Sequence, residues 1–183
     1  VLRFYLNRHV EKMFAGSHEP APVRARALSV DAPPAASLRR AAAALAKAER
    51  PLLIVGSQAL ALPAEAPQLA QAVANLGIPA YLSGMARGLL GRDAPLQMRH
   101  QRRLALREAD CVVLAGAPCD FRLDYGRHIR RSSTLIAANR SRADARLNRR
   151  PDIAAIGDAG RFLCQLAQTL GAQAARREGW IEA

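Results

Sequence analysis

Leu52-Leu53-Ile54-Val55-Gly56 is a short, continuous apolar run that follows Arg50-Pro51 and ends in glycine. Consecutive apolar residues of this kind are typical of a strand that is buried on both faces of a parallel sheet. A glycine directly after the strand predicts a tight turn, where the backbone can approach another group closely. The run therefore predicts the first strand of an α/β domain.

Similar apolar runs recur along the chain and alternate with segments of helical character. Strands and helices that alternate in this way form βαβ units with a parallel sheet. The pattern predicts a doubly wound, mostly parallel sheet with helices on both faces, a Rossmann-like α/β fold. Ser37 is the expected N-cap of the first of these helices. The expected strands are 52–56, 78–82, 111–116, 134–139 and 152–158, and the expected helices are 38–49, 65–76, 97–109, 142–147 and 160–170.

Four regions follow from composition. Residues 1–14 have apolar side chains at helical spacing and are expected to form the end of a preceding domain or a connecting helix. Residues 15–36 are rich in Pro, Ala, Ser and Arg without a period, which predicts a linker. Residues 37–171 are expected to form one compact domain of the nucleotide-binding type, and residues 172–183 a tail or linker. A start without Met or a signal-peptide layout indicates an internal piece of a longer protein.

Charge and composition exclude several function classes. The chain has 27 Lys and Arg against 15 Asp and Glu, a net charge of +12, but the arginines are spread along the sequence and aromatic residues are few. We therefore expect no nucleic-acid partner. No apolar run is long enough to span a membrane. Cys111, Cys119 and Cys164 share no metal-ligand spacing and are expected to be free thiols.

Candidate binding residues follow the predicted strands, because ligands of such sheets bind beyond the carboxyl ends of the strands. Glycines there allow close backbone approach, and hydroxyl and amide groups offer hydrogen bonds to phosphate or ribose. On this interpretation Gly56→Val removes ligand binding and leaves the fold intact; the alternative is that each glycine only makes a turn. The candidates are Gly56, Ser57, Gln58, Ser83, Gly84, Gly116, Ala117, Asn139 and Asp158.

Catalytic motifs are missing. The sequence has no G-x-G-x-x-G fingerprint, no Walker A loop and no G-x-S-x-G elbow. Its four histidines are scattered, and we expect none to have an acidic partner at ligand spacing. We therefore predict no catalytic residue in this chain.

Several segments in order resemble the central domain of thiamine-diphosphate enzymes, a family that includes acetolactate synthases, oxalyl-CoA decarboxylases and 2-hydroxyacyl-CoA lyases. The resemblance covers about residues 37–170 and rests on Arg50 to Gln58, Leu76 to Pro79, Ala109 to Gly116 and Gly157-Asp158. Further segments look most like the CoA-lyase branch. They are Phe4 to Phe14, Ser83 to Leu90, Arg102 to Leu106 and Asp120 to Gly126.

The resemblance implies a carbon–carbon lyase that acts on 2-hydroxy fatty acyl-CoA and has three domains, of which this chain is the middle one. Thiamine diphosphate and magnesium would then bind in the flanking pyrimidine- and diphosphate-binding domains, and the isolated chain would be inactive. Gly157-Asp158-Ala159-Gly160 is similar to the family's metal motif, but we interpret it as the last strand and turn. A homo-oligomer at the endoplasmic reticulum membrane is also implied.

The middle domain of this family binds an adenine nucleotide, FAD or ADP, and the candidates above occupy the corresponding positions. Arg102 matches an arginine that the CoA branch directs at nucleotide phosphates. Asn139 stands where an acid usually binds ribose, and Pro95 to Met98 replace a Gly-Met-His-Gly stretch of flavin-binding members. Both departures disfavour FAD and leave ADP, the adenosine part of CoA or an empty pocket. A ligand-free structural or oligomerisation module and an NAD-type domain are the alternatives.

Overall fold

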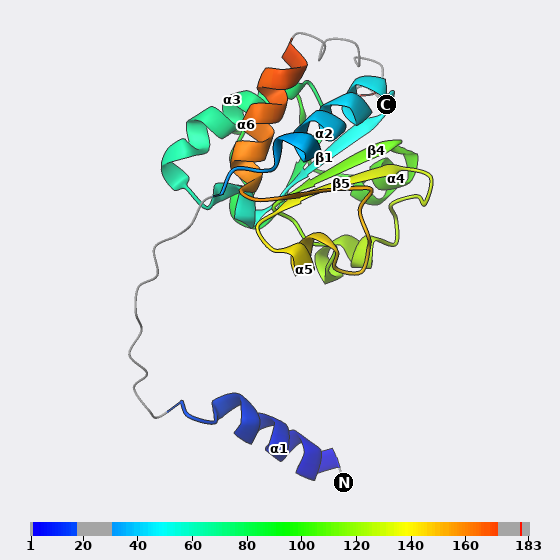
Figure 1. Cartoon of the computed structure of the whole chain (residues 1–183). Coiled ribbons are helices and arrows are strands. Elements are labelled where there is room, and N and C mark those ends of the chain that lie inside the picture. Colours follow the sequence, from blue (N-terminus) through cyan, green and yellow to red (C-terminus); the bar gives the residue numbers. More distant parts are fainter. Residues whose placement is uncertain (1, 18–30, 172–179, 181–183) are drawn as a thin grey trace.

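All six strands of the sheet run parallel, in the order β3-β2-β1-β4-β5-β6 (Figure 1). The computed structural model describes residues 2–17, 31–171 and 180. Parallel neighbours need crossover connections, and helices supply most of them. The strands are β1 (Pro51–Val55), β2 (Ala80–Leu82), β3 (Gln97–Met98), β4 (Cys111–Ala115), β5 (Thr134–Asn139) and β6 (Ile153–Ile156).

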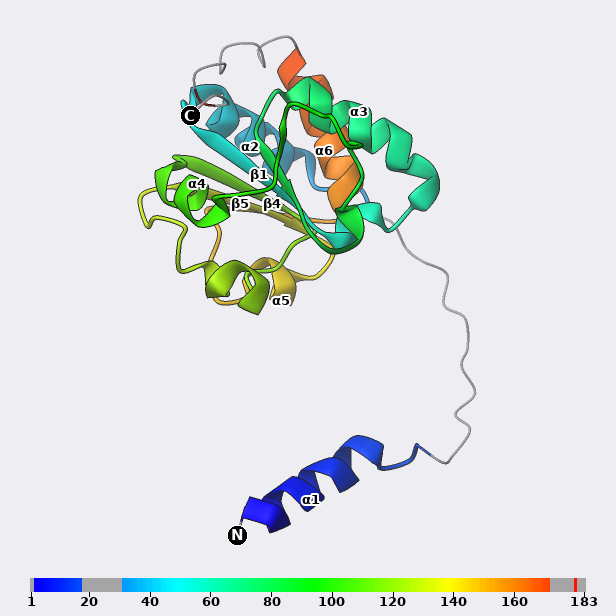
Figure 2. The same ribbon diagram turned by 180° about the vertical axis from the view of Figure 1, so that it is seen from behind.

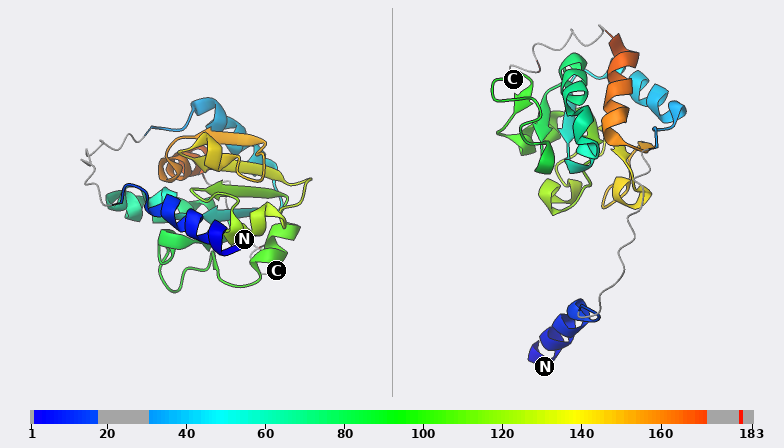
Figure 3. Two further views of the ribbon diagram at one scale, coloured as in Figure 1. Left: turned by 90° about the horizontal axis from the view of Figure 1, so that it is seen from below. Right: turned by 90° about the vertical axis from the view of Figure 1, so that its left-hand side faces the viewer.

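Helices cover both faces of the sheet. On one face lie α2 (Ala35–Lys47), α3 (Ala66–Leu76) and α6 (Ala159–Leu170), with α3 beside α6 in the right-hand view of Figure 3. On the other lie α4 (Arg102–Glu108), α5 (Arg142–Ala145) and the 3₁₀ segment η4 (Phe121–Gly126), as Figures 1 and 2 show from opposite sides. The predicted doubly wound α/β fold is confirmed.

Two cores result from the alternation of side chains along each strand. In β1, Leu53 and Val55 pack with the α2, α3 and α6 side, whereas Leu52 and Ile54 pack with α4 and η4. Successive side chains of a strand point to opposite faces, so a strand that is covered on both sides must be apolar throughout. All five residues of β1 and of β4 are accordingly buried.

The first helix of the domain begins earlier than expected. It starts at Ala35, with Pro34 at the N-cap position, so the predicted cap at Ser37 is wrong. The Ser37 hydroxyl instead donates to the Ala154 carbonyl at 3.0 Å and joins α2 to β6. Ala35 and Ala36, which we expected at the end of the linker, therefore belong to the first turn of α2.

The predicted helix 97–109 is divided. Gln97 and Met98 pair with Ala80 and Tyr81 as the edge strand β3, and the helix covers only Arg102–Glu108. Gln101 has a φ of 56°, in the left-handed region, which an α-helix does not continue through. The short η2 segment (Pro63–Glu65) likewise precedes α3, which begins at Ala66.

The N-terminal helix α1 (Leu2–Phe14) confirms the helical part of the prediction for residues 1–14, and none of its residues is buried. Residues 18–30 of the expected linker, and all of the expected tail except Trp180, lie outside the described residues. The Trp180 indole donates to the Pro51 carbonyl at 2.8 Å, so this residue contacts the beginning of β1. Among the described helices, none is long and apolar enough to cross a membrane.

The three cysteines are thiols, as predicted, with no disulfide among them: Cys111 and Cys119 are buried and Cys164 is partly buried. Burial raises the pKa of the Cys119 thiol from 9.0 to about 11, because the thiolate loses water; Arg149 opposes the shift. Between these two pKa values the unfolded chain releases the proton and the folded chain keeps it. Folding stability that is present below pH 9 is therefore lost as the pH rises toward 11.

We expect Cys119→Ala to remove part of the alkaline loss of stability. Other groups also titrate there, so the measurement is the difference between wild type and variant in urea midpoints at pH 8 and pH 10.5. The difference in urea midpoint between wild type and Cys119→Ala should be smaller at pH 10.5 than at pH 8. Cys164→Ala is the control for a thiol that is less buried. A gap that is the same at both pH values would contradict the predicted role of Cys119.

Candidate functional site

The strand order reverses between β1 and β4, and a pocket lies at their carboxyl ends. The chain continues from β1 to β2 on one side of the sheet, while β4 and β5 extend the other side. Such a reversal is where open parallel sheets bind ligands. The pocket has a volume of about 250 Å³. We call it the switch-point pocket; it is lined by Ile54, Gly56, Ser57, Gln58, Ser83, Gly84, Gly116, Ala117, Pro118, Asp120, Arg122 and Leu123.

Two glycines at the base of this pocket are packed backbone against backbone. A Cβ on Gly56 would lie 2.3 Å from the Gly116 carbonyl oxygen, and one on Gly116 would lie 2.4 Å from the Ala59 nitrogen. The backbone amide of Gln58 donates to the same Gly116 carbonyl at 3.3 Å. The expectation that Gly56→Val leaves the fold intact is therefore wrong, because the added side chain meets backbone of the turn after β4.

Ser57 joins the ends of β1 and β2. Its Oγ accepts a hydrogen bond from the Met85 amide at 3.1 Å, in the 3₁₀ segment η3 (Gly84–Ala86). Gly84 has a φ of +59°, and a Cβ there would lie 2.2 Å from this Oγ. The structure thus brings together the predicted candidates that follow β1, β2 and β4. They are Gly56, Ser57, Gln58, Ser83, Gly84, Gly116 and Ala117.

Two charged residues of the pocket were not among the predicted candidates. Asp120 and Arg122 form an ion pair, and an Asp120 oxygen also accepts from the Arg122 amide at 2.9 Å. Asp120 is the one carboxylate among the residues that define the pocket. A useful signal would have been an aspartate a few residues beyond a buried strand, at the start of a turn.

Gln58 connects the pocket to α5 through a hydrogen bond from its Nε2 to an Asp144 oxygen at 3.2 Å. Asp144 is held in turn by its amide, which donates to the Ser141 hydroxyl at 3.2 Å. A residue outside the pocket, Asp144, therefore fixes the orientation of the Gln58 side-chain amide.

Asn139 and Asp158 do not line this pocket. Asn139, at the end of β5, is 1% exposed, and its Oδ1 accepts from the Ser141 amide at 3.2 Å. Asp158 is 3% exposed and caps α6 by accepting from the Arg161 amide at 2.9 Å. The second polar atom of each side chain, Asn139 Nδ2 and Asp158 Oδ2, is buried without a hydrogen-bond partner in the described part of the chain. Both residues act as turn and helix caps in this structure.

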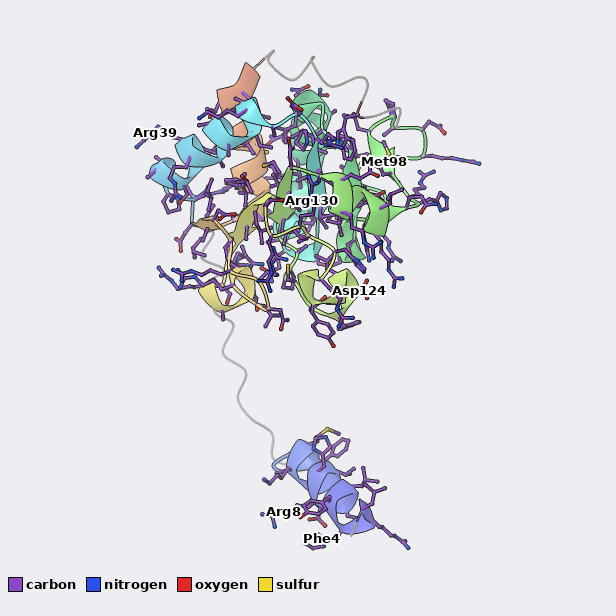
Figure 4. The ribbon with its side chains drawn as sticks, turned by 90° about the vertical axis from the view of Figure 1, so that its right-hand side faces the viewer. Phe4, Arg8, Arg39, Met98, Asp124 and Arg130 are labelled. Atoms are coloured by element: carbon purple, nitrogen blue, oxygen red, sulfur yellow. The ribbon has the colours of Figure 1, made fainter. Side chains whose placement is uncertain are left out.

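Arg102 lies in a second, larger pocket beside the first. Its Nη2 donates at 2.5 Å to the carbonyl of Arg122, a residue of the switch-point pocket. The second pocket has a volume of about 630 Å³, and Met98 marks its position in Figure 4. We call it the arginine pocket; it is lined by Tyr81, Leu82, Arg87, Gly88, Gln97, Met98, Arg99, Gln101, Arg102 and Arg103.

Tyr81 anchors the wall that the sheet contributes to the arginine pocket. Its hydroxyl donates to the His100 carbonyl at 2.5 Å. Burial raises the pKa of Tyr81, and the nearby positive charge of Arg102 opposes the shift. The tyrosine is therefore a neutral hydrogen-bonding group at neutral pH.

The described residues do not supply a metal centre. No group of three or more His, Cys, Asp or Glu side chains among residues 2–17, 31–171 and 180 is placed to hold an ion. Asp158 of the sequence Gly157-Asp158-Ala159-Gly160 caps α6 after the last strand, as we interpreted it. One expectation is corrected: His128 does have an acidic partner, since its Nε2 lies 3.2 Å from an Asp124 oxygen that Arg103 also contacts.

Comparison with known proteins identifies relatives over the whole chain. Human 2-hydroxyacyl-CoA lyase 2 is 42% identical over 186 residues, which cover 100% of this chain and 29% of the human protein. The acetolactate synthase large subunit of Mycobacterium tuberculosis is 36% identical over 80% of this chain and 26% of its own. The chain thus spans less than a third of these curated relatives.

Solved structures share the fold. Benzoylformate decarboxylase from Polynucleobacter necessarius superposes with a TM-score of 0.60 at 20% identity, over 83% of this chain and 30% of that one. A family model described as the central domain of thiamine pyrophosphate enzymes matches residues 38–166. This chain belongs to the thiamine pyrophosphate enzyme family and corresponds to the central domain of these enzymes.

Proposed function

We propose that this chain is the central domain of a thiamine-diphosphate-dependent 2-hydroxyacyl-CoA lyase, which cleaves a carbon–carbon bond of 2-hydroxy fatty acyl-CoA. The observation that carries the proposal is the 42% identity to human 2-hydroxyacyl-CoA lyase 2, which extends over the whole chain. The flanking pyrimidine- and diphosphate-binding domains are then its partners. The full-length protein is proposed to be a homo-oligomer at the endoplasmic reticulum membrane.

Thiamine diphosphate supplies the nucleophilic carbon of such a lyase when it is bound. The described residues do not fit this group or its magnesium ion: they form no metal cluster, and Asp158 is a buried helix cap. On this proposal the chain binds or positions a ligand, and the flanking domains carry out the chemistry.

We expect the isolated 183-residue chain to be inactive. It should neither cleave 2-hydroxyacyl-CoA nor bind thiamine diphosphate with magnesium, because no described cluster of side chains can hold the metal. Calorimetry with the cofactor and an assay for aldehyde release test this. The full-length protein is the positive control, and measurable turnover by the fragment would contradict the proposal.

The switch-point pocket is proposed to bind an adenine nucleotide, as a structural or regulatory ligand. Its volume of about 250 Å³ suits one nucleoside better than a flavin dinucleotide, so ADP or the adenosine part of CoA is favoured over FAD. Asp120 lines the pocket and can accept a hydrogen bond from a ribose hydroxyl, whereas Asn139 is buried outside the pocket. Arg102, beside the pocket, would bond the phosphates.

Asp120→Asn should weaken adenosine binding about ten-fold, because a charge-assisted hydrogen bond becomes a neutral one. Asn keeps an acceptor for the Arg122 amide, so the turn should remain folded. Asp93→Asn, an exposed carboxylate outside the pocket, is the matched control for net charge. Calorimetry measures the affinities. Wild type that binds neither adenosine nor ADP would favour the alternative, a ligand-free structural or oligomerisation module.

A further inference from the structure

The N-terminal helix α1 has a face of large apolar side chains that nothing in the described part of the chain covers. Leu2, Leu6 and Val10 follow one another at intervals of four residues, and Tyr5 and Met13 lie beside them on the same side of the helix. These five side chains, which we call the apolar face of α1, are between 48% and 73% exposed. Single exposed apolar residues are common on proteins, but a continuous row on one face marks a surface for a partner.

Basic side chains border the apolar face on both sides. Arg3 lies about two turns before Val10, and Lys12 about two turns after Tyr5, so each is in line with a residue at one edge of the face. Glu11, the one carboxylate of α1, lies on the opposite side of the helix. The surface is therefore apolar along its middle and positive along both edges.

The opposite side of α1 is polar apart from Phe4. Figure 4 shows Phe4 and Arg8 on the same side of the helix, as their four-residue spacing requires. Asn7 and Glu11 complete this side. A helix with one apolar face, a charged opposite side and basic edges is typical of segments that lie in the interface of a lipid bilayer.

The length of α1 determines how it can meet a bilayer. Its thirteen residues extend about 20 Å, whereas the hydrocarbon core of a bilayer is about 30 Å thick. The helix can therefore lie in the plane of the surface but cannot cross it. In that position the long side chains of Arg3 and Lys12 reach the headgroups while their stems stay on the apolar layer, and Tyr5 keeps its hydroxyl at headgroup level.

Other partners fit this helix less well. A second copy of α1 would bring basic edges against basic edges, since neither edge has a carboxylate. The groove between α3 and α6 also has no carboxylate in its lining, so it would leave Arg3 and Lys12 without an anionic partner. Anionic headgroups supply negative charge on both sides of a helix that lies among them.

We propose that α1 is an interfacial helix that binds the surface of a membrane containing anionic lipids. A helix of this length without packing contacts is marginal in water, so burial of its apolar face among acyl chains also stabilises the helix itself. Lipid binding by α1 deepens the proposed membrane location of the full-length protein, because it names the segment that contacts the lipid. It does not depend on the lyase activity.

The test is co-sedimentation of the 183-residue chain with vesicles, at about 0.15 M salt so that long-range attraction is screened. The vesicles contain phosphatidylcholine alone, or phosphatidylcholine mixed with phosphatidylserine. Wild type should bind the mixed vesicles about ten-fold more tightly than the neutral ones, because each basic residue near an anionic surface adds to the affinity. Circular dichroism should show more helix when the mixed vesicles are added.

Two pairs of variants separate the contributions of the apolar face and of its edges. Leu6→Gln should weaken binding to the mixed vesicles about ten-fold, whereas Phe4→Gln, on the opposite side, should change it less than about two-fold. Lys12→Gln should weaken binding about five-fold. Arg39→Gln, exposed on α2, removes the same charge away from α1 and should change binding less than about two-fold. Thermal unfolding checks that the domain of each variant is intact.

No binding to the mixed vesicles, or equal binding to mixed and neutral vesicles, would overturn the proposal. Equal losses in Leu6→Gln and Phe4→Gln would also overturn it, as would equal losses in Lys12→Gln and Arg39→Gln, which indicate general attraction by the net charge of +12. Dimerisation that Leu6→Gln removes, without vesicle binding, would assign the face to a second copy instead. The proposed function fails separately: full-length protein that binds vesicles through Leu6 but cleaves no 2-hydroxyacyl-CoA would refute the lyase and support the role of α1.

Discussion

Gly116→Ala is expected to lower the free energy of unfolding by more than about 4 kcal/mol, because two separate effects act at this position. Gly116 has a φ of +67°, where an L side chain is strained by about 1–2 kcal/mol. The new Cβ would also lie 2.4 Å from the Ala59 nitrogen and 2.8 Å from the Gln58 carbonyl carbon. Both are backbone atoms, so neither can rotate away and the turn after β1 must shift.

Gly91→Ala separates the two effects. Gly91 has a similar φ of +79°, and a Cβ there would meet no atom within 4 Å. The free energy of unfolding of Gly91→Ala should therefore fall only by the backbone strain, about 1–2 kcal/mol. Urea unfolding of both variants measures the difference. Equal losses would show that the contact between the turns after β1 and β4 does not constrain position 116.

A large loss of stability in Gly116 variants also changes how binding data for this site are interpreted. A typical domain is stable by only 5–15 kcal/mol, so such a variant is close to unfolding. Reduced nucleotide affinity in Gly56 or Gly116 variants would then reflect a distorted turn and not the loss of a contact with the ligand. Side chains that reach into the pocket, such as Asp120, are better probes because their substitution spares the backbone.

The strands that are buried on both faces could be predicted from sequence, whereas the edge strand could not. β5 occupies Thr134–Asn139 as predicted, and β1 is shifted by one residue, because a strand covered by two helical layers must be apolar throughout. β3 has only two residues, both half-buried. Its pairing depends on contacts such as that from the Ala80 amide to the Leu96 carbonyl, which no local pattern encodes.

The residues that follow the predicted strands identified most of the switch-point pocket, but its two charged residues, Asp120 and Arg122, were not predicted. Asp120 and Arg122 return to the sheet edge through η4, where Asp124 and Tyr125 have φ values of 48° and 57°. Non-glycine residues rarely adopt this left-handed conformation, so the direction of the loop was not predictable from residue types. Arg102 was predicted within a longer helix and thus without its actual neighbour, the Arg122 carbonyl.

Phe162→Ala is expected to destabilise the domain by about 3–5 kcal/mol, through lost burial and the cavity left behind. Phe162 is 0% exposed and lies on α6, which packs against α2, α3 and the 3₁₀ segment η1 (Ser57–Leu60) after β1. Gln168→Ala, exposed on the same helix, should change stability by less than about 0.5 kcal/mol. Urea midpoints and slopes for both variants measure the two effects. Because η1 carries Ser57 and Gln58, looser packing of α6 should also weaken adenosine binding in Phe162→Ala at urea concentrations below its unfolding transition. A variant as stable as wild type would contradict the packing of α6 on which the position of the switch-point pocket depends.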